Sequence, residues 1–100
     1  MNGFTALHIA AHDGRGRKLE TVQTLVNRGA DLTKRTDAGY TPFYLACKSG
    51  SEEIVEYILS PSEDKIPGIA VQPDGKGKTP LMKAAANNYL AVMEMLLKKI

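Results

Sequence analysis

The residues whose types and spacing most clearly suggest a chemical function lie at 72–79, where the sequence QPDGKGKT ends in the Gly-Lys-Thr of a phosphate-binding loop. In that motif a first glycine lets backbone N–H groups surround a phosphate, and the Thr hydroxyl holds magnesium. Here Gln72 stands in place of that glycine, and Pro80 follows Thr79 where a helix should simply continue. The strand-like residues 69–71 precede the motif, but no acidic strand is available for the metal. We therefore expect no nucleotide site.

Two histidines and one cysteine are the other groups with reactive side chains. His8 and His12 stand four residues apart and would share one helical face, as a pair of zinc ligands does. A third ligand is missing, and no Glu follows His8 as the metalloprotease motif requires. Cys47 has only Lys48 as a basic neighbour and no base placed to activate it. We therefore expect no metal, no cofactor and no catalytic activity.

Length and composition describe one soluble domain. The 100 residues are 43% hydrophobic and 24% charged, which is enough for a core and close to the globular average. The net charge of +2 is too small to imply a nucleic-acid partner unless the basic residues cluster. No apolar stretch is long enough for a membrane span, and the N-terminus lacks the pattern of a signal peptide. A lone cysteine suits a reducing compartment, so we expect a cytoplasmic or nuclear protein.

An internal repeat supplies the elements that must position any site. Three segments align without gaps, at residues 3–11, 39–47 and 77–85, and each reads Gly, any residue, Thr and then a short helical pattern. The spacing of the threonines becomes constant once insertions at residues 14–18 and 60–68 are allowed for. The chain is therefore a single domain of three repeats, at about residues 2–36, 37–73 and 74–100.

Each repeat is expected to form a pair of helices. A threonine can cap the first helix, and Pro42 and Pro80 suit its first position because a missing N–H costs nothing there. The first helix should bury a large residue followed by two small ones, at Leu7, Ala10 and Ala11, at Phe43, Ala46 and Cys47, and at Leu81, Ala84 and Ala85. The second helix should bury a heavier apolar face, at Leu19, Val22, Leu25 and Val26, at Ile54, Val55, Ile58 and Leu59, and at Val92, Met93, Leu96, Leu97 and Ile100. Such short pairs cannot bury both faces alone, so they must stack.

The sequence also marks helix ends and one doubtful core position. Gly29 is expected to end the second helix of the first repeat, and Ser51 to cap the second helix of the second repeat through its side chain. Ile9, Leu45 and Lys83 occupy one position in the three repeats. Because the third of them is charged, we expect Ile9 and Leu45 to be partly exposed.

The repeats closely resemble the ankyrin repeat family, through TALHIAA at 5–11, TPFYLA at 41–46, TPLMKAA at 79–85 and GAD at 29–31. The resemblance covers essentially the whole chain and implies an all-α ankyrin solenoid, in which stacked helix pairs are joined by extended hairpin-like loops. It implies that His8 is the family's structural histidine, which hydrogen-bonds near the capping Thr.

The sequence departs from the family at several positions. The family's histidine becomes Tyr44 and Met82, which should weaken the local hydrogen bonding in the second and third repeats. The loop glycine after the first helix is present as Gly14 and Gly50 but is Asn88 in the third repeat. The last helix keeps its apolar residues where terminal repeats are usually polar, so further repeats or another domain are expected in the parent protein.

The function that the resemblance implies is binding of another protein, without catalysis. Family members contact partners through the hairpin tips and the concave surface of the first helices. Carried over to this sequence, those positions are Phe4, His12, Asp13, Asp37, Ala38, Tyr40, Lys48, Ser49, Lys76, Lys78, Ala86 and Asn87. Phe4 and Tyr40 share the Gly-x-Thr position and would be either neighbouring exposed aromatics or rings packed within the hairpins.

Other interpretations stay open at this stage. The basic residues form three groups, namely Arg15, Arg17 and Lys18, then Lys34 and Arg35, then Lys76 and Lys78. They are either solvated loop residues or a site for an acidic partner. The chain is a protein-interaction module, a targeting or regulatory segment of a larger enzyme or signalling protein, or a structural spacer.

Overall fold

The computed structural model describes residues 3–12, 18–59 and 68–98, and every regular element within them is helical. The helices form three consecutive pairs: α1 (Ala6–His12) with α2 (Lys18–Asn27), α3 (Pro42–Ser49) with α4 (Glu52–Ile58), and α5 (Pro80–Ala86) with α6 (Leu90–Leu97). Both insertion sites of the repeat lie largely outside the described residues. No helix in the described part of the chain is long and apolar enough to cross a membrane.

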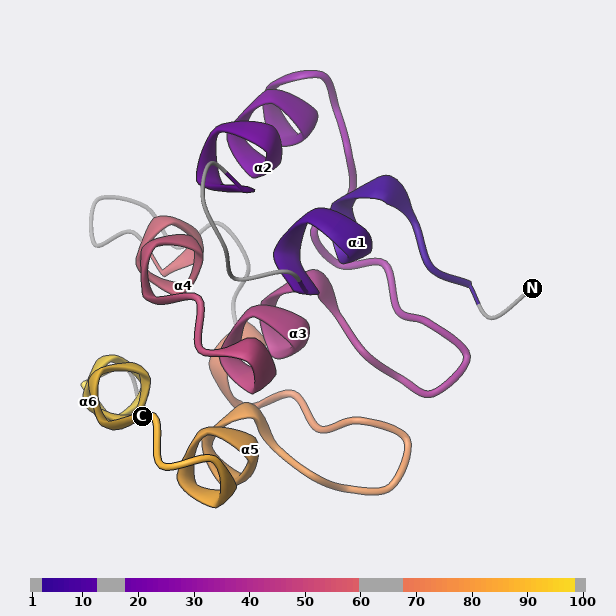
Figure 1. Ribbon diagram of the computed structural model, residues 1–100. Coiled ribbons are helices and arrows are strands. Elements are labelled where there is room, and N and C mark those ends of the chain that lie inside the picture. The colour runs from indigo at the N-terminus through magenta and orange to yellow at the C-terminus, as the bar shows by residue number, and fades with distance from the viewer. Residues whose placement is uncertain (1–2, 13–17, 60–67, 99–100) are drawn as a thin grey trace.

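The pairs stack in chain order as two rows of helices (Figure 1). One row contains α1, α3 and α5, the other contains α2, α4 and α6, and each helix packs on its neighbours in the row and on its partner in the pair. The loops that lead into α3 and α5 project from the first row, on the side away from the second row (Figure 1). This is the stack of helix pairs with projecting loops that the sequence predicted.

Residues 69–71 are not a strand. They form η1 (Ile69–Val71), a 3-10 turn closed by a hydrogen bond from the N–H of Val71 to the carbonyl of Gly68 at 3.2 Å. Ile69 and Ala70 are buried in this turn, which packs against α5. The apolar run that suggested a strand therefore serves to anchor the loop to the core.

Each first helix begins directly after a threonine that caps it. The cap hydrogen bonds run from the N–H of His8 to Oγ1 of Thr5, of Tyr44 to Thr41, and of Met82 to Thr79, at 3.3, 3.0 and 3.3 Å. Pro42 and Pro80 are the first residues of α3 and α5, as expected, and Ala6 holds that position in α1.

Three helices end in the same left-handed turn. Its central residue is Gly29, Gly50 or Asn88, with φ of 95°, 77° and 60°. The N–H of the next residue then bonds back to the last turn of the helix, from Ala30 to Leu25, Ser51 to Ala46 and Tyr89 to Ala84, at 2.9 Å each. Asn88 thus replaces the loop glycine without changing the turn, because asparagine tolerates this conformation better than most residues.

Ser51 lies at the cap position of α4, but its side chain does not cap the helix. Its hydroxyl lies 3.0 Å from the hydroxyl of Ser49 instead. The backbone explains the difference, because ψ is 82° at Ser51 and 163° at the capping Thr41, so the hydroxyl is not directed at the first turn. The predicted cap position of Ser51 and the acidic first turn of Glu52 and Glu53 are therefore confirmed, but the capping hydrogen bond expected from the serine side chain is not formed.

The core lies between the two rows and is most complete in the first two pairs. The large-small-small positions of α1 and α3 are all buried, with exposed fractions of 3% or less. In the third pair Leu81 is half-buried, Ala84 is buried and Ala85 is exposed. The counterparts of Ala85 in α1 and α3 are covered by the next helix of the row. Ala85 is exposed because α5 is the last described helix of its row.

Leu45 is buried, contrary to expectation. Its exposed fraction is 1%, compared with 59% for Ile9 at the same position of α1, and Lys83 in α5 is half-buried. The middle helix of a row has a neighbour on each side, so a position that is open on an end helix becomes covered on α3.

Leu45→Ala should therefore lower the free energy of unfolding by about 2–5 kcal/mol, the usual cost of truncating a buried leucine. Ile9→Ala is the matched control, and it should change that free energy by less than about 0.5 kcal/mol because the side chain is exposed. Urea denaturation followed by circular dichroism measures both. Equal effects of the two substitutions would contradict the order of the stack.

Ala6→Pro should raise the melting temperature. Thr5 already caps α1 and the other two repeats have proline at this position, so the ring fits and restricts only the unfolded chain. The expected gain is about 0.4–1 kcal/mol, or a few degrees for a domain of this size. Ala6→Gly should shift the melting temperature in the opposite direction. A lower melting temperature for Ala6→Pro would mean that α1 does not begin at this residue.

Candidate functional site

Two hairpin-like loops precede α3 and α5 and are closed in the same way. In the first, the N–H of Thr36 donates to the carbonyl of Tyr40 at 2.9 Å, and Oγ1 of Thr36 accepts the N–H of Tyr40 at 3.2 Å. Asp74 holds the place of Thr36 in the second, and its N–H donates to the carbonyl of Lys78 at 2.8 Å. Its Oδ1 accepts the N–H groups of Lys76 and Lys78 at 2.8 and 3.0 Å. A polar side chain at the same position therefore fixes each loop.

The phosphate-loop-like sequence at 72–79 forms this second hairpin. Its backbone N–H groups at Lys76 and Lys78 are turned toward the Asp74 carboxylate, which occupies the donors that a phosphate would need. The short helix α5 then begins at Pro80.

The two hairpins lie directly against each other. The N–H of Gly75 donates to the carbonyl of Ala38 at 2.8 Å, and Nη2 of Arg35 donates to the carbonyl of Pro73 at 2.9 Å. Gly39 has a φ of 86°, and a Cβ there would overlap the backbone nitrogen of Gly75, so glycine is required for this close approach. The stacking of the hairpins brings two of the three basic groups of the sequence onto neighbouring loops.

His8 is buried and ties α1 to the first hairpin. Its Nδ1 accepts the N–H of Thr5 at 3.1 Å and lies 2.8 Å from Oγ1 of the same threonine. Its Nε2 lies 2.9 Å from the carbonyl of Lys34 and 3.0 Å from that of Tyr40. Because both neighbours of Nε2 are carbonyls, this nitrogen carries the hydrogen and donates. The hydrogen bonds near the capping Thr that the family resemblance implies for His8 are therefore present.

Tyr44 takes the place of His8 in the second repeat and ties α3 to the second hairpin. Its hydroxyl donates to Oδ2 of Asp74 at 2.7 Å, and the exposed fractions of the two residues are 1% and 7%. The expectation that this substitution weakens the local hydrogen bonding of the second repeat is wrong, because the tyrosine donates to a carboxylate where the first hairpin offers carbonyls. Met82 holds the same position in the third repeat and is 51% exposed.

Burial and hydrogen bonding shift the pKa of both members of this pair. Burial raises the pKa of the Tyr44 phenol, and the hydrogen bond to Asp74 and its charge raise that pKa further. Burial also opposes ionisation of Asp74, but the hydrogen bonds from Tyr44 and from the N–H groups of Lys78 and Lys76 prevail and lower its pKa. At neutral pH Tyr44 is thus a neutral donor and Asp74 an anion. Sequence reasoning missed both residues, although Tyr44 stands at the position of the structural histidine.

The two aromatic residues of the expected binding surface each pack against a ring on the first helix of the same repeat. Phe4 is 38% exposed, and its ring meets the ring of His8 edge-on with 5.7 Å between centroids. Tyr40 is half-buried and stacks on Tyr44 with 5.0 Å between centroids and 14° between planes. Nζ of Lys48 lies over the Tyr40 ring, 5.1 Å from its centre. Each ring therefore combines packing within the repeat with a surface that remains accessible.

The other expected binding residues lie at the hairpin tips and the ends of the first helices. Those with exposed side chains are His12, Asp37, Ala38, Lys76, Lys78, Ala86 and Asn87. Ser49 is half-buried and its hydroxyl is engaged with Ser51, while Nδ2 of Asn87 donates to the carbonyl of Lys48 at 3.2 Å. Asp13, Arg15 and Arg17 lie outside the described residues. A binding role for these positions stays a prediction.

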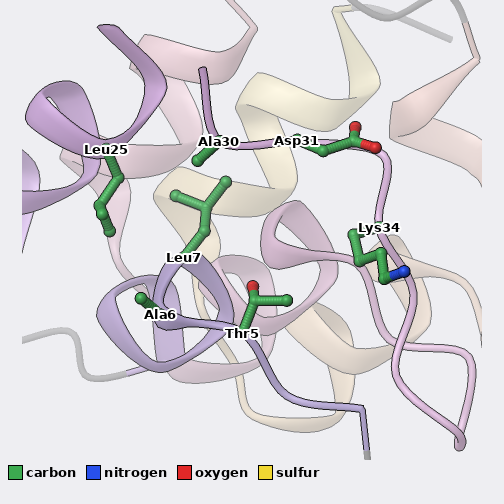
Figure 2. A pocket seen from close by; sticks show the side chains of 7 residues that line it. All are labelled: Thr5, Ala6, Leu7, Leu25, Ala30, Asp31 and Lys34. Carbon is green, nitrogen blue, oxygen red and sulfur yellow. The ribbon is translucent and has the colours of Figure 1, made fainter. Parts of the chain in front are cut away.

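A pocket of about 230 Å³ lies apart from these residues, where the start of α1 faces the end of α2 (Figure 2). Leu7, Leu25 and Ala30 line one part of it, and Asp31 and Lys34 lie on the other part. The carboxylate of Asp31 is held in its own turn by the N–H and hydroxyl of Thr33, and these hydrogen bonds lower its pKa. The pocket therefore combines an apolar wall with one acidic and one basic side chain.

Cys47 is fully buried in α3, within the core. Burial raises the pKa of its thiol, so the uncharged form dominates at neutral pH. The cysteine therefore serves as a small packing residue. Within the described residues there is also no group of three or more His, Cys, Asp or Glu side chains that could hold a metal ion.

Tyr44→Phe should lower the free energy of unfolding at neutral pH by about 1.5–3 kcal/mol, because it removes a hydrogen bond to a charged, largely buried acceptor. The pKa of Asp74 is lower in the folded chain than in the unfolded chain. Its stabilising contribution is therefore complete above the unfolded-state pKa, near pH 4, and disappears as the pH falls through the folded-state pKa.

The variant should consequently lose less stability than the wild type when the pH is lowered from 7 to about 3. Thermal melts across this range measure the difference. Tyr89→Phe, at a half-buried tyrosine of the third repeat, is the matched control and should keep the wild-type pH dependence. A Tyr44→Phe variant with the wild-type pH dependence would disprove the coupling of the two residues.

Known proteins share the repeats of this sequence. The family model described as ankyrin repeats (3 copies) matches residues 7–100. The chain is 36% identical over 90 residues to protein phosphatase 1 regulatory subunit 27 of Homo sapiens, covering 82% of this chain and 56% of that protein. The Mus musculus protein of the same name is 33% identical over 93 residues, with 85% and 58% covered.

A second kind of relative is much longer than this chain. The SMC5-SMC6 complex localization factor protein 1 of Homo sapiens is 31% identical over 98 residues, covering 98% of this chain and 9% of that protein. The chain spans little more than half the length of the phosphatase regulatory subunits it matches. Because the family model extends over nearly all of the sequence, which folds into three consecutive helix pairs, this chain belongs to the ankyrin repeat family.

Proposed function

We propose that this chain is a non-catalytic protein-interaction module that binds its partner through the hairpin tips and the concave surface of the first helices. The observation that carries the proposal is the rigid attachment of both hairpins to the helix rows. His8 and Tyr44 hold the loops from below, and the Gly75–Ala38 hydrogen bond joins them side by side. Side chains on loops fixed in this way lose little conformational entropy when they bind.

The state of the reactive groups supports a role without catalysis. Both ring nitrogens of His8 and both carboxylate oxygens of Asp74 are engaged in hydrogen bonds within the chain. The thiol of Cys47 is buried and protonated at neutral pH. These groups therefore stabilise the repeats, and the side chains left at the hairpin tips are suited to contact a partner.

A regulatory or targeting role within a larger enzyme or signalling assembly is the alternative. The names of two relatives, a phosphatase regulatory subunit and a complex localization factor, favour this role over that of a structural spacer. In this alternative the catalytic part lies outside these residues. One buried thiol is compatible with a reducing environment, so we retain the proposal of a cytoplasmic or nuclear location.

We also propose that a further repeat or another domain packs on α5 and α6 in the parent protein. Met82 and Ala85 are exposed, although their counterparts in α1 and α3 are buried. Leu97, at the end of α6, is 56% exposed. The same positions that join the first two repeats to their successors are therefore open on the third.

Tyr40→Ala should weaken partner binding about 30-fold or more if the ring is an interface anchor, which corresponds to a loss of about 2 kcal/mol. Affinity purification from a cell extract, with the chain as bait, identifies the proteins to be tested, and titration with each purified protein measures the change. Circular dichroism must first show that the variant is folded, because Tyr40 also packs on Tyr44.

Lys78→Glu changes the same surface without touching the core, and it should weaken the same interactions. Arg28→Glu is the matched control, because Arg28 is an exposed cation beyond the end of α2. The proposal would be refuted by proteins whose binding is unchanged by Tyr40→Ala and Lys78→Glu but is abolished by Arg28→Glu. Such a result would place the binding site on the second helices.

A further inference from the structure

Charge is distributed unevenly between the two sides of the stack. Among the described side chains, the first helices and the loops that lead into them carry the cations Lys34, Arg35, Lys48, Lys76, Lys78 and Lys83. The acids on this side are Asp31, Asp37 and Asp74. The second helices and their ends carry the acids Glu20, Glu52, Glu53, Glu56 and Glu94 and the cations Arg28 and Lys98. The small net charge of the chain therefore conceals a basic side and an acidic side.

Contacts connect several of these cations into one surface on the second and third repeats. Lys48 lies over the ring of Tyr40, which stacks on Tyr44, and the hydroxyl of Tyr44 bonds to Asp74. The backbone N–H of Lys78 donates to Asp74 at 3.0 Å, and the positive charge of Lys83 helps to lower the pKa of the same carboxylate. We call the surface formed by Tyr40, Lys48, Lys78 and Lys83 the basic surface.

The acidic residues on this side do not neutralise the basic surface. Asp74 is 7% exposed, and both its oxygens already accept hydrogen bonds from Tyr44, Lys76 and Lys78. Asp31 is held by Thr33 in a separate turn, and the carboxylate of Asp37 lies close to Gly3 at the start of the first repeat. The basic surface therefore contains three lysines but only one nearby carboxylate, the largely buried Asp74, and a partner with negative charge would meet a complementary potential.

A polypeptide fits this surface better than a nucleic acid does. The single aromatic ring of the basic surface, Tyr40, is already covered by Tyr44 and by the Lys48 ammonium, so it offers no free face on which a base could stack. The cations are a few lysines beside an aromatic edge, rather than a long stripe that follows a phosphate backbone. Such a surface suits short carboxylate side chains that alternate with apolar contacts.

We propose that the partner segment bound at the basic surface is an acidic polypeptide, whose Asp or Glu side chains pair with Lys48, Lys78 and Lys83 while an apolar residue packs on the edge of Tyr40. This proposal rests on the proposed function and adds the chemistry of the partner. The glutamate-rich second helices repel the same peptide and direct it to the side of the hairpins.

Selection from a random-sequence peptide library displayed on phage tests the proposal without a known partner. The wild-type chain is the target, and the selected sequences are compared with the unselected library. We expect enrichment of Asp and Glu. Selected peptides are then synthesised with a fluorescein label, and their affinity is measured by anisotropy at low and high salt, where binding should weaken as the salt concentration rises.

Each of the two matched variants removes two positive charges, one variant from the side of the first helices and the other from the side of the second helices. Lys48→Gln combined with Lys78→Gln should weaken the selected peptides about three- to tenfold and reduce their salt dependence. Arg28→Gln combined with Lys98→Gln should leave their affinity within about twofold of the wild type. Peptides with every Asp and Glu replaced by Asn and Gln should lose binding to the wild type. Thermal melts confirm that both variants stay folded.

The outcomes separate this proposal from the proposed function. Neutral selected peptides whose binding is abolished by Tyr40→Ala but not by the lysine variant would overturn the proposal of an acidic partner. The same result would support the proposed binding surface. Peptides that respond to neither variant would count against both proposals. A mixed-sequence single-stranded RNA that binds more tightly than the acidic peptides, and is weakened by the lysine variant, would overturn the choice of a polypeptide.

Discussion

Helices of seven to ten residues are the constraint on which this structure depends. Isolated helices of this length are marginal in water, so each pair is stable only through the apolar faces it buries against its neighbours. The small residues Ala10, Ala11, Ala46 and Cys47 allow the first helices to approach closely, and all four are buried. The middle repeat gains most from this arrangement because it is covered on both sides, and Leu45 is buried there while Ile9 is exposed.

The hairpins take their position from the same stack. One side chain in each of the first two helices of the row reaches the loop of the next repeat, through His8 to carbonyl groups and through Tyr44 to the carboxylate of Asp74. The second tie uses a charged acceptor, and the hydrogen bonds to Asp74 lower its pKa and so favour the ionised aspartate beneath the loop surface. Stability is thus coupled to the geometry of the proposed binding surface, since the bonds that hold the hairpins also set where Tyr40 and Lys78 are presented.

The separation of charge has a simple structural origin. First and second helices alternate along the chain, but in the folded stack all first helices lie in one row and all second helices in the other. A sequence with a net charge of +2 therefore gives one side rich in lysine and one side rich in glutamate. Long-range attraction and repulsion from these sides act together on an approaching segment. The family membership shows a protein-binding fold, and the charge pattern adds a chemical preference to the binding proposed for it.

The sequence by itself determined the repeats, the threonine and proline starts of the first helices and the left-handed turn after the second helix of the first repeat. These features depend on short-range sterics and hydrogen bonds, which a few neighbouring residues contain. The burial of Leu45, the meeting of Tyr44 with Asp74 and the placement of lysines from two repeats on the side of the first helices were decided only by the tertiary structure. Each of them joins residues from different repeats, and only the packing of one repeat on the next sets the distances between them.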